Sequence, residues 1–202
     1  VLSRLFRVQA AHDNGVTVCQ VGEGADELFW GYPGWKTSLR LQHLNDLPMP
    51  TVFKRMGLFV MRALGRDFSF SYEWLRRGSE GQPVFWGGAE AFTETHKSQL
   101  LSPRLRKKLQ GVSSWAAVEP FHQRFQAKAK DRSWLNWMTY LDLNLRLPEL
   151  LLMRVDKMSM GVSLEGRVPF LDHKLVELAM GIPEAVKTRN GTLKLILKKA
   201  VR

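Results

Sequence analysis

The sequence lacks the features that mark disulfide-bonded, secreted or membrane-spanning proteins. Cys19 is its single cysteine, which excludes an intrachain disulfide and favours a cytoplasmic location. No apolar run reaches the ~20 residues needed to cross a bilayer, and no charged-then-apolar leader opens the chain. The five histidines are scattered, so the sequence contains no Cys/His metal-binding set. We therefore expect no membrane partner.

Acidic residues are scarce beside basic ones, with 19 Asp and Glu against 30 Lys and Arg, which gives a net charge of +11. Such an excess favours anionic partners, whether nucleotide, phosphate, nucleic acid or membrane surface. The chain has 202 residues, 45% of them apolar, which is enough to bury a core. The absence of Met at position 1 leads us to expect part of a longer protein.

One segment has the pattern of a strand, and most of the others have the pattern of helices. Residues 16–21 form a short β-branched apolar run, which makes them the best strand candidate in the chain. We expect a turn at 33–34, mainly loop over 65–88, and a helix that breaks or restarts at Pro148. The fold class is therefore predicted as α/β with a mainly helical bulk. Helices are expected at 1–12 (with Leu2, Leu5 and Phe6 on one side), 25–30, 51–64, 102–109, 134–147, 148–158, 172–181 and 192–202.

Three of these helices have a candidate N-cap residue. Ser102 precedes a proline at the first helical position, which is a common helix start. Asp172 and Thr192 are expected to cap the last two helices of the chain.

The most informative stretch is GEGADE, residues 22–27, which comes after the predicted strand and opens a helix. Ligands bind at such strand ends in α/β sheets, and a helix N-terminus favours anions. Glu23, Asp26 and Glu27 would repel phosphate unless a divalent cation bridges them, and their i, i+3, i+4 spacing lets them share one face. The alternative is structural, because acids in a first helical turn stabilise any helix by ~0.3–1 kcal/mol.

A second block of charged residues among apolar ones is RVDKMSMGVSLEGRVPFLDH, residues 154–173. It is either a functional segment or a turn between helices. In the structural alternative, Glu165 pairs with Arg167 and Pro169 fixes an extended segment before Asp172. His173 then lies at the surface.

These two blocks resemble one protein family. VGEGADELFWGY (21–32) is similar to the SGEGADELFGGY signature of the synthetase domain of glutamine-hydrolysing asparagine synthetases. The block at 154–179 is similar to the same family's DRMSM and RVPFLDH stretches, and residues 182–184 and 192–202 resemble the family's next segment. Residues 36–130 are not diagnostic.

The resemblance implies a single partial domain over 1–202, of the ATP-pyrophosphatase type (adenine nucleotide alpha hydrolase-like). Its implied reaction activates an aspartate-like carboxylate as an acyl-AMP with ATP and Mg²⁺, and ammonia from a glutaminase domain then forms the amide. Val21 and Gly22 would lie at the nucleotide, Glu23 would help to deprotonate the amine, and Asp26 would hold Mg²⁺ and pyrophosphate. The oligomeric state, including a homo-oligomer, stays open.

The sequence also departs from the family pattern. Val21 stands where the family has Ser, and Trp30 where Gly is usual, which is consistent with a divergent acceptor carboxylate. The family's SGGxDS pyrophosphate loop and its glutaminase domain do not occur in these residues, so we expect the fragment alone to be inactive.

A different class of function also fits the composition. A basic helical nucleic-acid-binding module would use the net charge, residues 104–108 and the acid-free last sixteen residues. The alternative for these basic residues is a solvated helix face.

Overall fold

The computed structural model describes residues 2–189 and 191–202, with side chains from residue 7 onward, apart from residue 190. The apolar side expected at Leu2, Leu5 and Phe6 therefore lies outside the described residues. The chain divides into two compact units. The first comprises the residues up to Pro33 together with Met138–Arg202, and the second comprises Gly34–Trp137.

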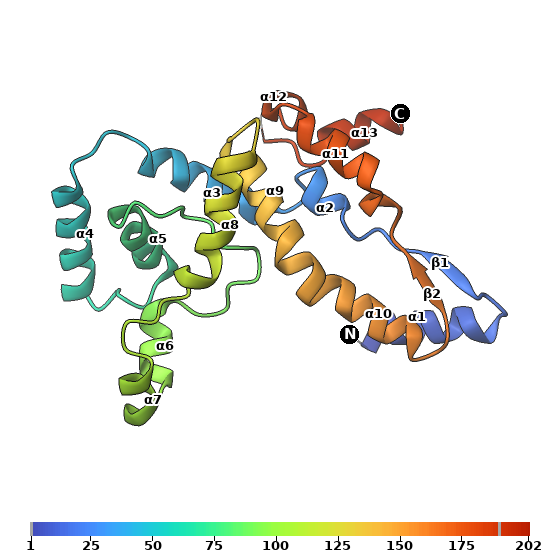
Figure 1. Cartoon of the computed structure of the whole chain (residues 1–202), viewed down its shortest axis with the longest axis horizontal. Helices are drawn as coiled ribbons and strands as arrows, with labels where there is room; N and C mark the ends of the chain where they lie inside the picture. Colours follow the sequence, from blue (N-terminus) through green and yellow to red (C-terminus); the bar gives the residue numbers. More distant parts are fainter. Residues whose placement is uncertain (1, 190) are drawn as a thin grey trace. The chain divides into compact units, whose positions relative to one another are not determined.

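The first unit contains a small parallel sheet (Figure 1). Strand β1 (Val18–Gln20) pairs with β2 (Glu165–Arg167), and Cys19 lies opposite Gly166. The sequence predicted only the first strand. A turn between helices was one interpretation of 154–173, and β2 shows that this part of the block is a strand. Its three residues, Glu-Gly-Arg, have low β-propensity, and their extended conformation is stabilised by pairing with β1.

One face of this sheet is covered by helices. Helix α10 (Met153–Met160) contacts both β2 and α1 (Leu2–Asp13), as Figure 1 shows. Val155 and Ser159 of α10 lie beside Gly166 of β2, where a Cβ would be in ordinary van der Waals contact with both. The helix therefore packs directly on the backbone of the strand.

Pro148 lies in the first turn of a new helical stretch. Helix α9 (Trp134–Asn144) is followed by a π-helical stretch, η1 (Leu147–Leu152), which continues into α10. The Met153 amide donates to the Pro148 carbonyl, an i to i−5 bond. The regular α-helix ends at Asn144, and helical structure restarts at Leu147 as a wider π turn, which accommodates the proline because it has no N–H to contribute to a regular helix.

The C-terminal segment of the first unit is made of short helices. After the 3₁₀ turn η2 (Pro169–Leu171) come α11 (His173–Gly181), α12 (Glu184–Lys187) and α13 (Leu195–Ala200). Asp172 caps α11, as predicted, by accepting from the Lys174 and Leu175 amides. The prediction for Thr192 is wrong, because α13 begins later and its N-cap residue is Lys194.

A small apolar core joins this C-terminal segment to the turn after β1. Leu28, at the end of helix α2 (Ala25–Leu28), and the adjacent Phe29 are buried against Ala179 of α11. The residues packed around these three are partly buried apolar side chains: Leu143, Phe170, Leu175, Val176, Ile196 and Leu197. The core therefore fixes α2, a single helical turn that would not be stable alone.

The second unit is built of helices. It contains α3 (Pro33–Asn45, from its second residue), α4 (Thr51–Ala63), α5 (Phe70–Ser79), α6 (Glu94–Leu100), α7 (Pro103–Lys108) and α8 (Trp115–Lys128). The turn predicted at 33–34 is instead the first turn of α3, where proline is well tolerated. Ser102 caps α7 as predicted. No helix among the described residues combines the length and apolarity that crossing a bilayer requires.

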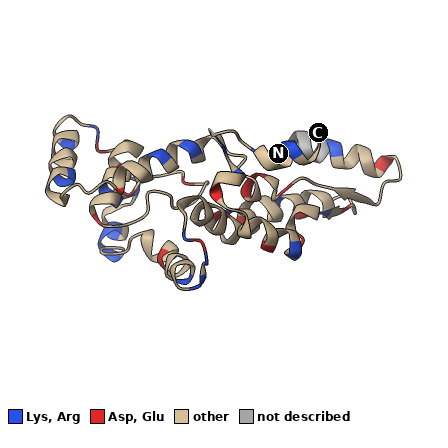
Figure 2. Ribbon diagram, turned by 90° about the horizontal axis from the view of Figure 1, so that it is seen from above, with Lys and Arg blue, Asp and Glu red and all other residues tan. Residues whose placement is uncertain are grey.

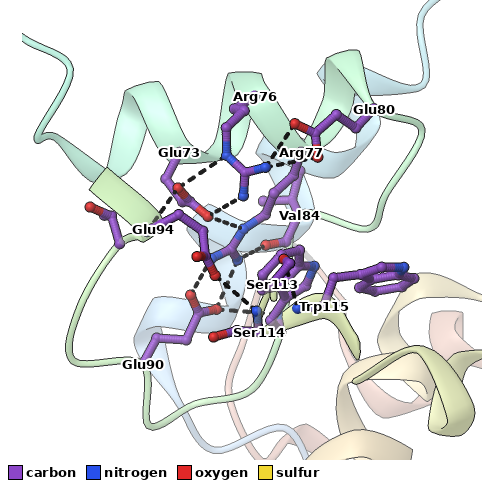
Figure 3. A network of polar contacts seen from close by, with 12 residues as sticks. Glu73, Arg76, Arg77, Glu80, Val84, Glu90, Glu94, Ser113, Ser114 and Trp115 are labelled. Carbon is purple, nitrogen blue, oxygen red and sulfur yellow. Dashed lines mark hydrogen bonds and ion pairs between the residues drawn. The ribbon is translucent and has the colours of Figure 1, made fainter. Parts of the chain in front are cut away.

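A buried ionic network holds the irregular segment after α5 (Figure 3). The Arg77 side chain is buried and donates from Nε to Glu73 at 3.1 Å and from Nη1 to the Val84 carbonyl at 2.8 Å. Its other guanidinium nitrogen pairs with Glu90, and its Cζ lies 3.8 Å from the centre of the Trp86 ring. Because one cation binds two carboxylates and a carbonyl, the loop is fixed without regular secondary structure.

Candidate functional site

A pocket opens at the carboxyl end of β1. It has a volume of about 390 Å³ and is lined by residues of α1, β1 and α10, including Cys19, Val21, Gly22 and Glu23. The Val21 amide donates to the Arg167 carbonyl at 2.8 Å, which extends the pairing of the strands to the edge of the pocket. Gly22 has open space where a Cβ would lie, so a ligand can approach its backbone closely.

The turn between β1 and α2 requires glycine at Gly24. This residue is the N-cap of α2 with φ of 93°, in the left-handed region, and a Cβ there would overlap the Leu171 side chain. The sharp turn places Glu23 on the pocket side and Asp26 in the first turn of α2. Val21, Gly22 and Glu23 therefore line one pocket, while Asp26 is not among its lining residues.

The spacing of Glu23, Asp26 and Glu27 predicted that the three acids can share one face of the helix. In the structure their side chains have different surroundings. Glu27 is buried, and its Oε1 accepts a hydrogen bond of 2.6 Å from the Tyr32 hydroxyl. Its backbone carbonyl accepts from Thr139 Oγ1 at 3.1 Å. Asp26 is partly exposed and forms an ion pair of 2.7 Å with Lys194. Glu27 therefore anchors the turn, which leaves Glu23 and Asp26 as the candidate functional acids.

Tyr32 is held in a network that sequence reasoning missed. Burial, followed by the hydrogen bond to Glu27, raises the pKa of Tyr32 well above its usual value, so the hydroxyl remains a donor. The Arg146 guanidinium carbon lies 4.1 Å from the centre of the Tyr32 ring, and Arg146 Nη1 pairs with buried Asp142 at 3.3 Å. The sequence signal was a charged pair, Asp142 and Arg146, four residues apart in a largely apolar helix.

The second sequence block has the contacts of the structural alternative. Glu165 and Arg167 form an exposed ion pair of 2.8 Å on β2, and Asp172 serves as a helix cap. His173 is exposed at the first position of α11. This block contributes to the pocket through Val155, Met158, Ser159 and Leu164, which are not its charged residues.

The acids around the turn fit a metal that is held partly by phosphate. In the part of the chain that the structure describes, no three His, Cys, Asp or Glu side chains gather into a metal-binding group. Mg²⁺ is commonly held by one or two carboxylates together with phosphate oxygens and water. The half-exposed Asp26 carboxylate suits that limited role.

The basic residues serve partly internal functions. Lys54, Arg77 and Lys187 are buried, and the ammonium of Lys54 contacts the Asn45 side chain and backbone carbonyl at 2.6 and 2.8 Å. The basic segment at 104–108 lies on exposed α7. Figure 2 shows Lys and Arg on many separate helices, with Asp and Glu among them. The three buried basic residues are therefore engaged inside the chain and are not displayed to an anionic partner.

Comparison with known proteins identifies the class of protein to which this turn and pocket belong. The family model described as asparagine synthase matches residues 2–202. The chain belongs to the asparagine synthase family.

The chain is also similar to individual proteins, two of which are named asparagine synthetases. The chain is 36% identical over 200 residues to asparagine synthetase [glutamine-hydrolyzing] 1 of Bacillus subtilis (strain 168), covering 97% of this chain and 29% of that protein. It is 29% identical over 189 residues to asparagine synthetase [glutamine-hydrolyzing] 3 of the same organism, covering 89% and 23%. It is 24% identical over 229 residues to amidase chyE of Penicillium rubens, covering 100% and 32%.

The chain spans less than a third of the length of the curated relatives it matches. No solved structure gave a significant match.

Proposed function

We propose that this chain is part of the synthetase domain of an enzyme that forms an amide on an aspartate-like carboxylate at the expense of ATP. The observation that carries the proposal is the turn after β1. Gly22 and Glu23 line a pocket there, and Asp26 is the second residue of the helix α2 that follows. This turn lies within the match to the asparagine synthase family. The names of the Bacillus subtilis relatives support glutamine as the source of ammonia.

In the proposed reaction, a carboxylate oxygen attacks the α-phosphorus of ATP and pyrophosphate leaves, which gives an acyl-AMP. Ammonia then attacks the acyl carbon, a proton is lost, and AMP leaves with the former carboxylate oxygen. Gly22 binds the nucleotide through backbone that no side chain covers, and Val21 lines the same pocket beside it. Glu23 accepts the proton of the attacking amine.

Asp26 is the proposed ligand of Mg²⁺, which when bound neutralises negative charge on the departing pyrophosphate. The role of Asp26 is then to hold the positive charge of the metal beside the first turn of α2. We further propose that both compact units belong to one synthetase domain, of which these residues form a part, and that the enzyme is cytoplasmic.

The first test is Asp26→Asn in the complete protein. We expect pyrophosphate release to fall by orders of magnitude at limiting Mg²⁺, because Asn keeps the size of Asp but not its charge. The unfolding free energy should change by only ~0.3–1 kcal/mol, the usual contribution of an acid in a first helical turn. Glu177→Gln, on the exposed face of α11, is the matched control. Normal release in the Asn variant would contradict the assignment.

The second test is Glu23→Gln, which separates the two half-reactions. We expect isotope exchange between pyrophosphate and ATP to persist, because the acyl-AMP can still form. Capture by ammonium should slow, because the amide of Gln cannot accept a proton. An equal loss in both half-reactions would instead assign Glu23 to substrate binding.

A further inference from the structure

We infer that Lys194 is a positioning residue that holds the Asp26 carboxylate for the metal. This inference rests on the proposed function, in which Asp26 is the metal ligand. Lys194 Nζ lies 2.7 Å from Asp26 Oδ1, and the two side chains are 32% and 38% exposed. The contact is made by Oδ1, and we propose that the carboxylate held in this way is the one that would bind the cation.

The backbone of Lys194 is attached to the same turn as Asp26. Its amide donates to the Phe29 carbonyl at 3.1 Å and to the Trp30 carbonyl at 3.4 Å. Lys194 is also the N-cap of α13, with φ of 53° in the left-handed region, which is uncommon for a residue other than glycine. The start of α13 is thus hydrogen-bonded to the residues that follow α2.

Side-chain packing fixes α13 in the same place. Ile196 and Leu197 pack against the core of Leu28, Phe29 and Ala179. Leu28 is the last residue of α2, the helical turn that contains Asp26. The core therefore holds the backbone of α13, which begins after Lys194, against the backbone of α2. The ammonium therefore reaches Asp26 from a backbone that is anchored at several points.

Gly31 leaves little room for another arrangement of the pair. A Cβ at this position would overlap Asp26 Oδ1 and would lie 2.6 Å from Lys194 Cε. The Gly31 amide donates to the Asp26 carbonyl at 2.8 Å. The ion pair thus lies directly on the Gly31 backbone, which limits the directions in which the carboxylate can point.

An ion pair this exposed contributes little to the free energy of unfolding. We therefore expect the loss of Lys194 to change the rate of the reaction and not the stability of the fold. If Lys194 acts through Asp26, its removal should matter only while Asp26 carries a carboxylate. The prediction is therefore one of coupling between two residues, which a double-mutant cycle measures.

The experiment compares Lys194→Met, Asp26→Asn and the double variant in the complete protein. We expect Lys194→Met to slow pyrophosphate release at least tenfold at limiting Mg²⁺, and to have less than a threefold effect in the Asp26→Asn background. If the Asn enzyme releases too little pyrophosphate to measure, calorimetric binding of magnesium pyrophosphate provides the same cycle. Lys194→Arg should restore part of the rate, and unfolding midpoints should change by less than about 2 °C.

Lys198→Met, which removes an exposed cation from the same helix, is the matched control and should leave the rate unchanged. Equal effects of Lys194→Met in both backgrounds would overturn the inference and assign the lysine to direct contact with the phosphates. Wild-type release by Lys194→Met with an inactive Asp26→Asn would also overturn it while leaving the proposed function intact. Wild-type release by Asp26→Asn would overturn both.

Discussion

Trp30 has a backbone conformation that is costly for a side chain of its size. Its φ is 58°, in the left-handed region, and the residue is 3% exposed. The family signature that this stretch resembles has glycine at the same place, where a positive φ carries no steric cost. Burial of a large aromatic side chain offsets the cost here. This turn thus accommodates a buried tryptophan where the family signature has glycine.

The adjacent Gly31 leads to a prediction for Gly31→Ala. A Cβ would displace the Asp26 carboxylate and the end of Lys194, both of which are movable side-chain atoms. We therefore expect stability to fall by no more than the low end of the ~1–3 kcal/mol that overpacking costs. Pyrophosphate release in the complete protein should fall at least tenfold, because Asp26 is turned away from its proposed ligand.

Gly34→Ala is the control for this substitution, because a Cβ at Gly34 meets nothing within 4 Å. Steady-state pyrophosphate release and urea unfolding are measured for both variants. If Gly31→Ala retains the wild-type rate, the position of the Asp26 carboxylate is not important for the reaction.

At this scale the sequence predicted the acids and glycines of the turn but not their partners. Glu23 and Asp26 lie in a recognisable motif, and the pocket includes Glu23. Tyr32 and Lys194 also lie in the two segments that resemble the family, but their contacts were missed. The contact of Lys194 with Asp26 joins opposite ends of the sequence. Side-chain pairing of this kind depends on tertiary packing, which a single sequence does not reveal.

Among the elements, those with strong periodicity or a cap were predicted best. The helix capped by Asp172 was predicted, whereas β2 and the start of α13 were not. β2 owes its extended form to pairing with β1, and α13 begins where Lys194 is bonded to the end of α2. In both cases a long-range backbone contact overrides the weak local preference.

Helix α8 contributes a histidine whose pKa should affect stability. The His122 ring lies 5.0 Å from the Trp137 ring and 5.6 Å from the Trp115 ring, centre to centre. Burial among these rings lowers the pKa of His122, while the charge of Glu119 opposes the shift. Below the ordinary histidine pKa of ~6.5 the unfolded chain binds more protons than the folded one, so stability falls as the pH falls.

We accordingly expect the urea unfolding free energy to decrease between pH 7.5 and 5.5, and His122→Gln to weaken that decrease. His12→Gln serves as the control, because His12 is exposed at the end of α1. An unchanged pH dependence in the His122→Gln variant would show that the ring is not the group responsible.

For the whole chain, composition predicted little beyond a globular fold with an excess of cations. The net charge of +11 gave no indication that Lys54, Arg77 and Lys187 would be buried. The two-unit organisation was also not predicted, because the first unit combines the beginning and the end of the sequence. Only the two motifs, which lie near the opposite ends of the chain, indicated that these regions share a function.

We predict that the 202-residue chain, purified alone, binds Mg-ATP with a Kd in the millimolar range, equivalent to about −4 kcal/mol. In the proposed function, the nucleotide contacts the backbone of Gly22, which is open at the pocket beside β1, and the metal has one protein carboxylate, that of Asp26. The sequence contains no SGGxDS loop whose amides could surround the phosphates, so they would be held on one side. Isothermal titration with Mg-ATP measures the affinity, and a pyrophosphate assay with aspartate and ammonium measures turnover. Micromolar binding or steady pyrophosphate release would show that these residues form a complete site.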